Sequence, residues 1–221
     1  MKKKCAEKAF EMIEDGMIVG LGGGSTVALL IEKLEKQKKN IRAVTPSQDT
    51  MELCMKHQIP LIPLEMTEQI DIAFDGCDEL DQNLNALKSC GGIHTREKIA
   101  ASMAKEYVLL GDESKLFPEL KFQYPVTVEV IPSARKYVKK QLEQLGAKVT
   151  ERRGSSKTGV AVSDDGNYLM EAAFSKEEVE DVKALNQELN AIAGLVGHSL
   201  FYQIAARAVI AKTDGIDIIE R

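Results

Sequence analysis

The sequence predicts an α/β protein in which a mostly parallel sheet is joined to a smaller α+β unit. Strand-like apolar runs alternate with helix-like segments along the first half of the chain, and this alternation is typical of parallel sheets. The strand-like runs are almost continuously apolar, as in strands that helices cover on both faces. The pattern changes after about residue 122. We therefore expect a Rossmann-like domain over residues 1–122 plus 196–221 and a ferredoxin-like domain over residues 123–195.

The first half of the chain begins with a helix, a strand, a glycine loop and a second helix. Apolar residues recur at helical spacing from Cys5 to Ile13, and Asp15-Gly16 ends that helix before the strand MIVGL. The second helix carries its apolar residues, between Val27 and Leu34, on one face. The alternation then continues with strands at residues 41–45, 61–64, 70–76 and 107–111, and with helices over residues 48–57 and from about Thr95.

The second half predicts a β-α-β-β-α order, which is that of a ferredoxin-like module. The elements are a strand at residues 125–132, a helix at 133–146, strands at 159–163 and 168–174 around a turn with Asp165-Gly166, and a helix from about Ser175 to Ala191. The last strand-like stretch, residues 208–220, is expected to return to the first domain.

Composition excludes several classes of function. A net charge of −5 argues against a nucleic-acid-binding surface. The N-terminal stretch has no signal-peptide core and no membrane span, so we expect a cytoplasmic protein. The four cysteines are widely spaced, which favours reduced thiols. Cys90 and His94 have the spacing of two metal ligands, but two ligands are too few for a structural site, and we expect neither a metal nor a cofactor.

The stretch GLGGGSTV, residues 20–27, joins a strand to a helix through three glycines and two hydroxyls. Free backbone N–H groups at a helix N-terminus suit a phosphate, and Ser25 and Thr26 can add donors. The alternative is a tight turn in which Ser25 or Thr26 caps the helix. The spacing matches neither the dinucleotide-binding nor the P-loop fingerprint, so NAD and ATP are not favoured.

Acidic side chains follow the strand that ends near residue 75. Asp75 and Asp78 lie at its carboxyl end, where open parallel sheets bind their ligands. The alternative is that D-G-C-D-E is a solvated turn. We expect Asp81 to be a turn residue on the exposed side of this loop.

Two lysines and a glutamate complete the polar set. Lys88 precedes the pair Gly91-Gly92, and Glu97 follows at the start of a helix, so both can reach one pocket while the loop exposes N–H groups to an oxyanion. A glutamate there is also favoured simply by the helix dipole. Lys115 follows another strand end and is expected to point toward the same crevice. Arg96 and Lys98 are expected to face solvent, and His57, His94 and His198 to be structural or surface residues.

Taken in order, the motifs G-L-G-G-G-S-T-V, D-G-C-D-E, K-S-C-G-G-I-H-T-R-E-K, D-E-S-K and P-V-T-V-E-V-I-P resemble those of the type A ribose-5-phosphate isomerases. The resemblance covers nearly the whole chain. It implies an aldose–ketose isomerase that interconverts ribose 5-phosphate and ribulose 5-phosphate without a metal, forming a homodimer or homotetramer.

The resemblance also implies roles by position. Glu97 matches the base, Asp75 and Asp78 match the pair that handles hydroxyl protons and ring opening, and Lys88 and Lys115 match the substrate-binding lysines. As a hypothesis from the chemistry of the reaction, we expect Lys88 and the loop N–H groups to stabilise the developing oxyanion. Lys2 matches a lysine that reaches the phosphate. The remaining implied substrate contacts are Gly23, Gly24, Ser25, Thr26, Gly76, Cys77, Ser89, Cys90 and Gly91.

The chain departs from the family pattern at several positions. Gly23 replaces a threonine, Ser89 and Cys90 replace glycines, His94 occupies an apolar place, and Ser199 replaces another glycine. If Ser89 or Cys90 needed a positive φ, the backbone would be strained by about 1 kcal/mol or more, and both side chains could crowd the sugar. The changed loop at Ser89 and Cys90 keeps one alternative open, a non-catalytic sugar-phosphate sensor. A relative of the CoA transferases that uses a carboxylate nucleophile would share the α/β core, but the two lysines and the D-G-C-D pair have no evident role in it.

Overall fold

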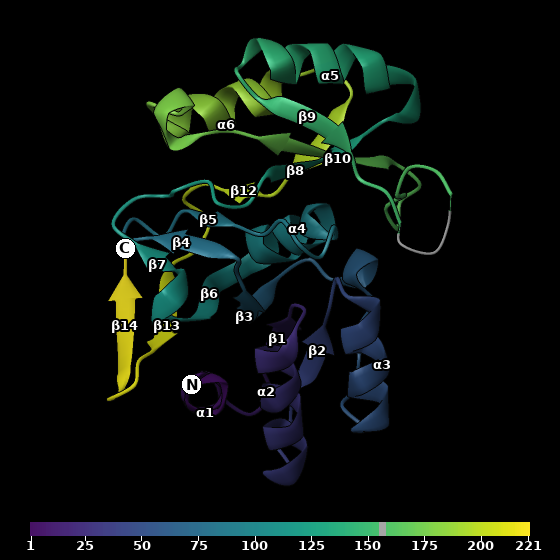
Figure 1. Ribbon diagram of the computed structural model, residues 1–221. Coiled ribbons are helices and arrows are strands. Elements are labelled where there is room, and N and C mark those ends of the chain that lie inside the picture. The colour runs from purple at the N-terminus through teal and green to yellow at the C-terminus, as the bar shows by residue number, and fades with distance from the viewer. Residues whose placement is uncertain (155–157) are drawn as a thin grey trace.

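A six-stranded sheet organises the lower part of the protein as Figure 1 shows it. The computed structural model describes residues 1–154 and 158–221. The strand order of the sheet is β14-β13-β6-β3-β1-β2, and every neighbouring pair is parallel except β13 with β14. The predicted α/β class is confirmed. The strands are β1 (Ile18–Leu21), β2 (Arg42–Val44), β3 (Ile70–Gly76), β6 (Ala104–Asp112), β13 (Arg207–Ala211) and β14 (Ile216–Glu220).

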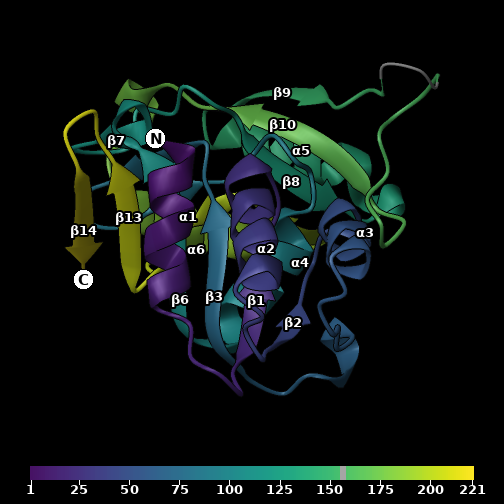
Figure 2. The same cartoon turned by 90° about the horizontal axis from the view of Figure 1, so that it is seen from below.

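Helices cover both faces of this sheet (Figure 2). On one face α1 (Lys2–Glu11), α2 (Ser25–Lys36) and α3 (Gln48–Lys56) contribute to a single core with side chains of β1, β3 and β6. On the other face α4 (His94–Met103) buries Ala100 and Ala101. Successive strand residues alternate between the two cores: Phe74 faces the first and Ala73 the second. This two-sided burial explains the continuous apolar runs.

A short sheet that the sequence did not predict lies beside α4. Its order is β12-β5-β4-β7, from β4 (Glu79–Asp81), β5 (Ala86–Leu87), β7 (Leu116–Phe117) and β12 (Leu200–Phe201). Asp81 is the buried last residue of β4, and its carboxylate accepts hydrogen bonds from the backbone N–H groups of Asn83 and Asn85, in the segment that leads to β5. Its predicted exposure is therefore wrong, and the residue ends a strand instead of lying in a solvated turn.

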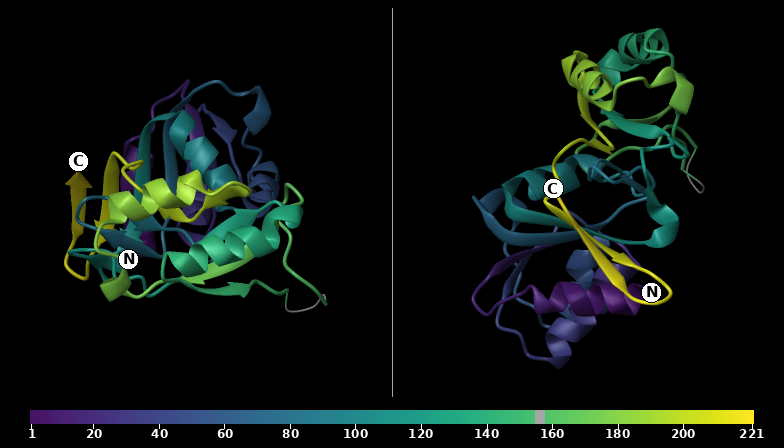
Figure 3. Two further views of the ribbon diagram at one scale, coloured as in Figure 1. Left: turned by 90° about the horizontal axis from the view of Figure 1, so that it is seen from above. Right: turned by 90° about the vertical axis from the view of Figure 1, so that its left-hand side faces the viewer.

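An antiparallel sheet with α5 (Arg135–Gln144) and α6 (Val182–Ala191) packed on it forms the remaining part (Figure 3). Its order is β11-β8-β10-β9. The strands are β8 (Val126–Val130), β9 (Lys148–Glu151), β10 (Tyr168–Ala173) and β11 (Leu195–His198). The sequence placed a strand at residues 159–163, and this was wrong. That segment makes only isolated bridges, whereas β9 pairs with β10.

Two further local predictions need correction. The expected strand at residues 61–64 is reduced to one bridge between Ala43 and Leu61, because Pro63 has no N–H to extend the ladder. The expected helix from Ser175 is split into a short turn of 3-10 helix, Lys176–Glu178, and α6. The expected return of residues 208–220 is observed, since β13 pairs with β6. The predicted domain boundaries remain predictions.

Within the described residues, no helix combines the length and apolarity needed to cross a membrane.

Candidate active site

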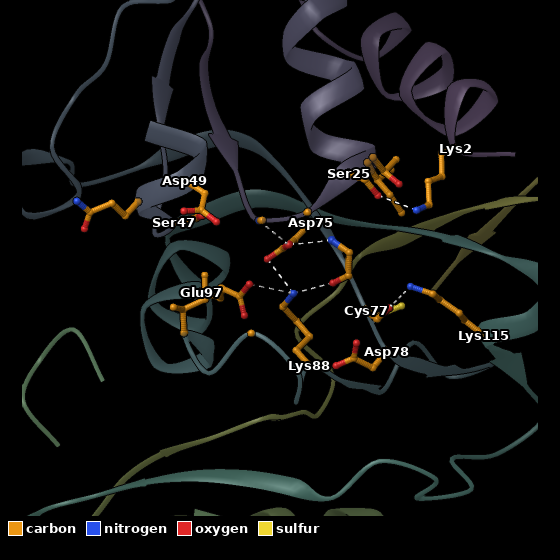
Figure 4. A pocket seen from close by; sticks show the side chains of 18 of the residues that line it. Lys2, Ser25, Ser47, Asp49, Asp75, Cys77, Asp78, Lys88, Glu97 and Lys115 are labelled. Carbon is orange, nitrogen blue, oxygen red and sulfur yellow. Dashed lines mark hydrogen bonds and ion pairs between the residues drawn. The ribbon is translucent and has the colours of Figure 1, made fainter. Parts of the chain in front are cut away.

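A cavity of about 480 Å³ lies at the carboxyl edge of the parallel sheet (Figure 4). Segments that follow β1, β2, β3 and β6 converge there with the start of α4. Thirteen of the fifteen predicted site residues line it. These are Lys2, Gly23, Gly24, Ser25, Thr26, Asp75, Gly76, Cys77, Asp78, Lys88, Gly91, Glu97 and Lys115.

The Lys88 ammonium group lies between two carboxylates. Its Nζ is 3.0 Å from Oδ2 of Asp75 and 3.3 Å from Oε1 of Glu97, and it donates a hydrogen bond of 2.6 Å to the carbonyl of Gly76 (Figure 4). All three charged side chains are buried, with 4 to 8% of their surface exposed. The structure therefore brings Glu97, Asp75 and Lys88 into one cleft from three separate segments.

The Asp75 carboxylate is held by backbone N–H groups from its own strand, β3, and from the loop that follows β1. Its Oδ1 accepts hydrogen bonds from the N–H groups of Gly76 (2.8 Å) and Gly23 (3.2 Å). Gly22 allows this approach, because a Cβ there would lie 2.0 Å from the carboxyl carbon of Asp75. The third glycine, Gly24, has a φ of +92° at the start of α2. The glycine loop therefore places an aspartate as well as lining the cavity.

Burial and neighbouring charges shift the pKa values of this cluster. Burial, followed by repulsion from Asp75, raises the pKa of Glu97 to about 8, although Lys88 opposes this rise. Burial would by itself lower the pKa of Lys88, but the carboxylates of Asp75 and Glu97 raise it above its ordinary value. A carboxyl group that exchanges its proton near neutral pH beside a permanent cation is suited to acid–base chemistry.

The loop after Lys88 is arranged differently from the prediction. Ser89 and Cys90 are not among the described residues that line the cavity, and neither has a positive φ. Their N–H groups donate to Oδ2 of Asp78, at 2.6 and 3.0 Å. The positive φ falls instead on Gly92, at +72°. The expected strain and crowding from the two replaced glycines are therefore absent at these two positions.

The opposite end of the cavity is basic. Nζ of Lys2 donates to Oγ of Ser25 at 2.7 Å, beside the N-terminus of α2. Nζ of Lys115 donates to the carbonyl of Cys77 at 2.6 Å. Two ammonium groups and the positive end of a helix thus surround a space suited to an anion.

Sequence reasoning missed several residues that line this cavity. Ser47, Gln48 and Asp49 follow β2 at the start of α3, and Asp164 comes from the loop before β10. The first three carried the same signal as Asp75, because they follow an apolar strand of the parallel sheet. Asp164 carried no local signal. Ile93 and Leu110 add apolar surface.

The residues around α4 also differ from expectation. Lys98 does not face solvent: it is partly buried, and its Nζ donates to the carbonyl of Leu200 at 2.8 Å and lies 3.2 Å from Nδ1 of His198. Arg96 is more exposed and pairs with Asp165. His94 is fully buried with Nε2 3.3 Å from the carbonyl of Gly197, so it is structural.

Residues 1–154 and 158–221 contain no group of three or more His, Cys, Asp or Glu side chains arranged to hold a metal ion.

An α/β fold with a buried carboxylate–lysine–carboxylate cluster at the carboxyl edge of its parallel sheet is typical of acid–base enzymes. The family model for ribose 5-phosphate isomerase A (phosphoriboisomerase A) matches residues 42–215. The chain belongs to this family. A second model, that of the DeoR C-terminal sensor domain, matches residues 1–64.

Relatives of this family cover the whole chain. Ribose-5-phosphate isomerase A of Pyrococcus horikoshii is 38% identical over 226 residues, covering 100% of this chain and 98% of its own. The solved ribose 5-phosphate isomerase A of Methanocaldococcus jannaschii superposes with a TM-score of 0.92 at 34% identity, covering 100% of this chain and 98% of that one. The solved structure of a D-ribose-5-phosphate isomerase in complex with phospho-erythronic acid superposes with a TM-score of 0.93 at 36% identity. The match covers 100% of this chain and 97% of that one.

Proposed function

We propose that this chain interconverts D-ribose 5-phosphate and D-ribulose 5-phosphate through an enediolate, with Glu97 as the general base. The observation that carries this proposal is the Lys88 ammonium group held within 3.0 to 3.3 Å of Asp75 and Glu97 in a cavity with a basic far end. Family membership supports the same reaction. The solved relative with phospho-erythronic acid bound supports a phosphorylated sugar ligand.

Each group in the cavity has a chemical role in this proposal. Glu97 removes the proton from C2 of the open-chain aldose and returns it to C1, because the two carbons are adjacent. Asp75 moves a proton between O1 and O2. The Lys88 ammonium group stabilises the negative charge that develops on oxygen. Asp78 assists opening of the sugar ring, since only its Oδ2 is taken by the N–H groups of the 88–92 loop.

The phosphate binds at the basic end of the cavity, between Lys2, the start of α2 and Lys115. It takes no part in the chemistry, but its binding energy places C2 against Glu97. Ser25 and Thr26 supply hydroxyl groups at this end. A dephosphorylated pentose is therefore a poor substrate.

The proposal also covers the location and the oligomeric state of the protein. We place it in the cytoplasm as a homodimer or homotetramer. Met51, Ile99 and Val196 are exposed apolar side chains that line one groove, which supports association between copies. Light scattering on the purified protein measures the mass of the assembly.

A non-catalytic sugar-phosphate sensor is the second candidate, and the match of residues 1–64 to a sensor domain favours it. That match includes the glycine loop, but Asp75, Lys88 and Glu97 lie outside it. A sensor needs the anion site and not the acid–base cluster. Family membership over residues 42–215 also favours an isomerase over a CoA-transferase relative.

A coupled assay of ribose 5-phosphate turnover, with and without EDTA, tests the proposal. We expect turnover that EDTA leaves unchanged. Binding of ribose 5-phosphate without turnover identifies a sensor, and turnover abolished by EDTA identifies a metal-dependent enzyme. Either result overturns the proposed mechanism.

A further inference from the structure

The guanidinium group of Arg152 reaches from the antiparallel sheet to the loop that begins at Lys88. Nη2 donates to the carbonyl of Ser89 at 2.6 Å, and Nη1 donates to that of Cys90 at 3.2 Å. Arg152 directly follows β9, and its own N–H donates to the carbonyl of Leu169. One side chain thus ties two consecutive carbonyls of the loop to a different sheet.

Arg152 is itself fixed by two neighbours on the central strands of that sheet. Its Nε pairs with the carboxylate of Glu171 on β10, and its Nη2 donates to Oγ1 of Thr127 on β8 at 3.0 Å. Thr127 and Glu171 are direct partners in the ladder, and Oγ1 of Thr127 lies 2.9 Å from Oε2 of Glu171. The guanidinium group therefore has little freedom to move.

The loop is held from its other side by Asp78. Oδ2 of Asp78 accepts the N–H groups of Ser89 and Cys90, whose carbonyls Arg152 binds. The contact with Arg152 is close, because a Cβ on Gly92 would lie 2.7 Å from its Nη1. Loop residues 89 and 90 are thus bound through both their N–H and their C=O groups.

We propose that Arg152 is a positioning residue for the isomerase reaction, because it clamps the 88–92 loop and so places the Lys88 ammonium group between Asp75 and Glu97. Arg152 does not line the cavity, so it acts through Lys88. The inference rests on the proposed function. In this proposal, a residue next to the antiparallel sheet influences the reaction at the carboxyl edge of the parallel sheet.

The geometry gives this role a specific signature. Lys88 lowers the pKa of Glu97 against the effect of burial. A loop released from Arg152 lets Lys88 withdraw, so the pKa of Glu97 rises further and the acidic limb of the kcat/KM profile moves to higher pH. A residue that only stabilises the fold changes the melting temperature and leaves that limb in place.

The test compares Arg152→Met and Arg152→Lys with Arg153→Met as the matched control. Arg153 is the adjacent arginine, has 65% of its side chain exposed, and lies 3.8 Å from its partner Glu151. Activity on ribose 5-phosphate is measured against pH, well below each melting temperature. We expect Arg152→Met to lower kcat about tenfold to a hundredfold, with the acidic limb raised. Arg152→Lys should show a smaller loss of kcat and a smaller shift of the acidic limb than Arg152→Met. Arg153→Met should match the wild type in both quantities.

The inference is overturned if Arg152→Met keeps the wild-type kcat and the wild-type position of the acidic limb. It is also overturned if the loss of kcat is fully explained by the fraction of the variant that is unfolded. If Arg152→Met does not fold, Arg152→Lys decides, because it keeps the charge and the stem but cannot bind both carbonyls. An inactive wild type overturns the proposed function itself, whereas an active wild type beside an unaffected Arg152→Met overturns only the positioning role.

Discussion

Ser89 and Ser199 share a hydrogen bond of 3.0 Å between their hydroxyl oxygens, although 110 positions separate them in the chain. Both are fully buried. Oγ of Ser89 lies 2.5 Å from the carbonyl of Pro125, to which it donates, and Oγ of Ser199 accepts the N–H of Thr127. The two serines are therefore one linked feature, which joins the Lys88 loop to β8 and to the segment before β12.

We predict that Ser89 and Ser199 are energetically coupled. Ser199→Ala leaves the N–H of Thr127 without its acceptor and should cost about 1 to 3 kcal/mol of unfolding free energy. A double-mutant cycle with Ser89→Ala should give a coupling of about 0.5 to 3 kcal/mol by urea denaturation. Ser102→Ala, on the exposed face of α4, is the control. Purely additive effects would contradict the prediction.

Glu97 should determine the acidic limb of the activity profile. Because burial and Asp75 raise its pKa to about 8, the base is protonated below that pH, so log kcat/KM should fall as the pH drops below about 8. Lys88 keeps its proton throughout this range, since its pKa is raised. Stopped-assay rates between pH 5 and pH 10 measure the limb. An acidic limb with an apparent pKa near the ordinary value for glutamate would show that burial and Asp75 do not raise the pKa of Glu97.

The variant Glu97→Gln should lower kcat about 10²- to 10⁴-fold, the usual contribution of a general base. Glu52→Gln, on the exposed face of α3, is the control and should keep wild-type turnover. Turnover by Glu97→Gln at the wild-type rate would refute its assignment as the base.

Gly22 should tolerate no side chain. A methyl group there would overlap the carboxyl group of Asp75, 2.0 Å away, so Asp75 must leave its position beside Lys88. We expect Gly22→Ala to lose most of its kcat and about 1 to 3 kcal/mol of unfolding free energy. Gly215→Ala, where a Cβ would meet nothing within 4 Å, serves as the comparison. An active Gly22→Ala would show that Asp75 has no fixed position.

Because of Lys98, the free energy of unfolding should increase as the pH rises from about 7 to about 10. Burial lowers its pKa to about 7, below its ordinary value of 10.5. Between these values the unfolded chain binds a proton that the folded chain does not, so unfolding free energy rises with pH. Relative to Lys98→Met, the wild type should gain stability from pH 7 to pH 10, measured by urea denaturation. Glu97 titrates in both proteins, so its own contribution is common to the two stability curves. Parallel stability curves would contradict the predicted shift.

Much of the site followed from a single rule of parallel sheets. Apolar strands end at the same edge, so the polar residues after β1, β3 and β6 had to meet. The same rule applies to Ser47 after β2, which sequence reasoning left unused. Asp75 and Glu97 were predictable because one lies at the end of β3 and the other near the start of α4. Lys88 was placed with them because a glycine pair follows it in the chain.

Other features depend on partners too distant to leave a local pattern. The strands of the short sheet contain two or three residues, too few to show a period of two. Lys98 has the polar character of a surface residue, yet its partner carbonyl belongs to Leu200, 102 positions away. Residues 159–163 were assigned as a strand and β9 was not, because only the pairing of β9 with β10 distinguishes the two segments.

The position of β13 between β6 and β14 has a consequence for biosynthesis. While a ribosome is still making the segment that follows β6, the hydrogen-bonding edge of β6 has no neighbour on that side. The antiparallel sheet of β8 to β11 is translated in that interval. A nascent chain therefore carries an open, apolar strand edge on β6 until β13 has been made, and such an edge can pair with the wrong strand.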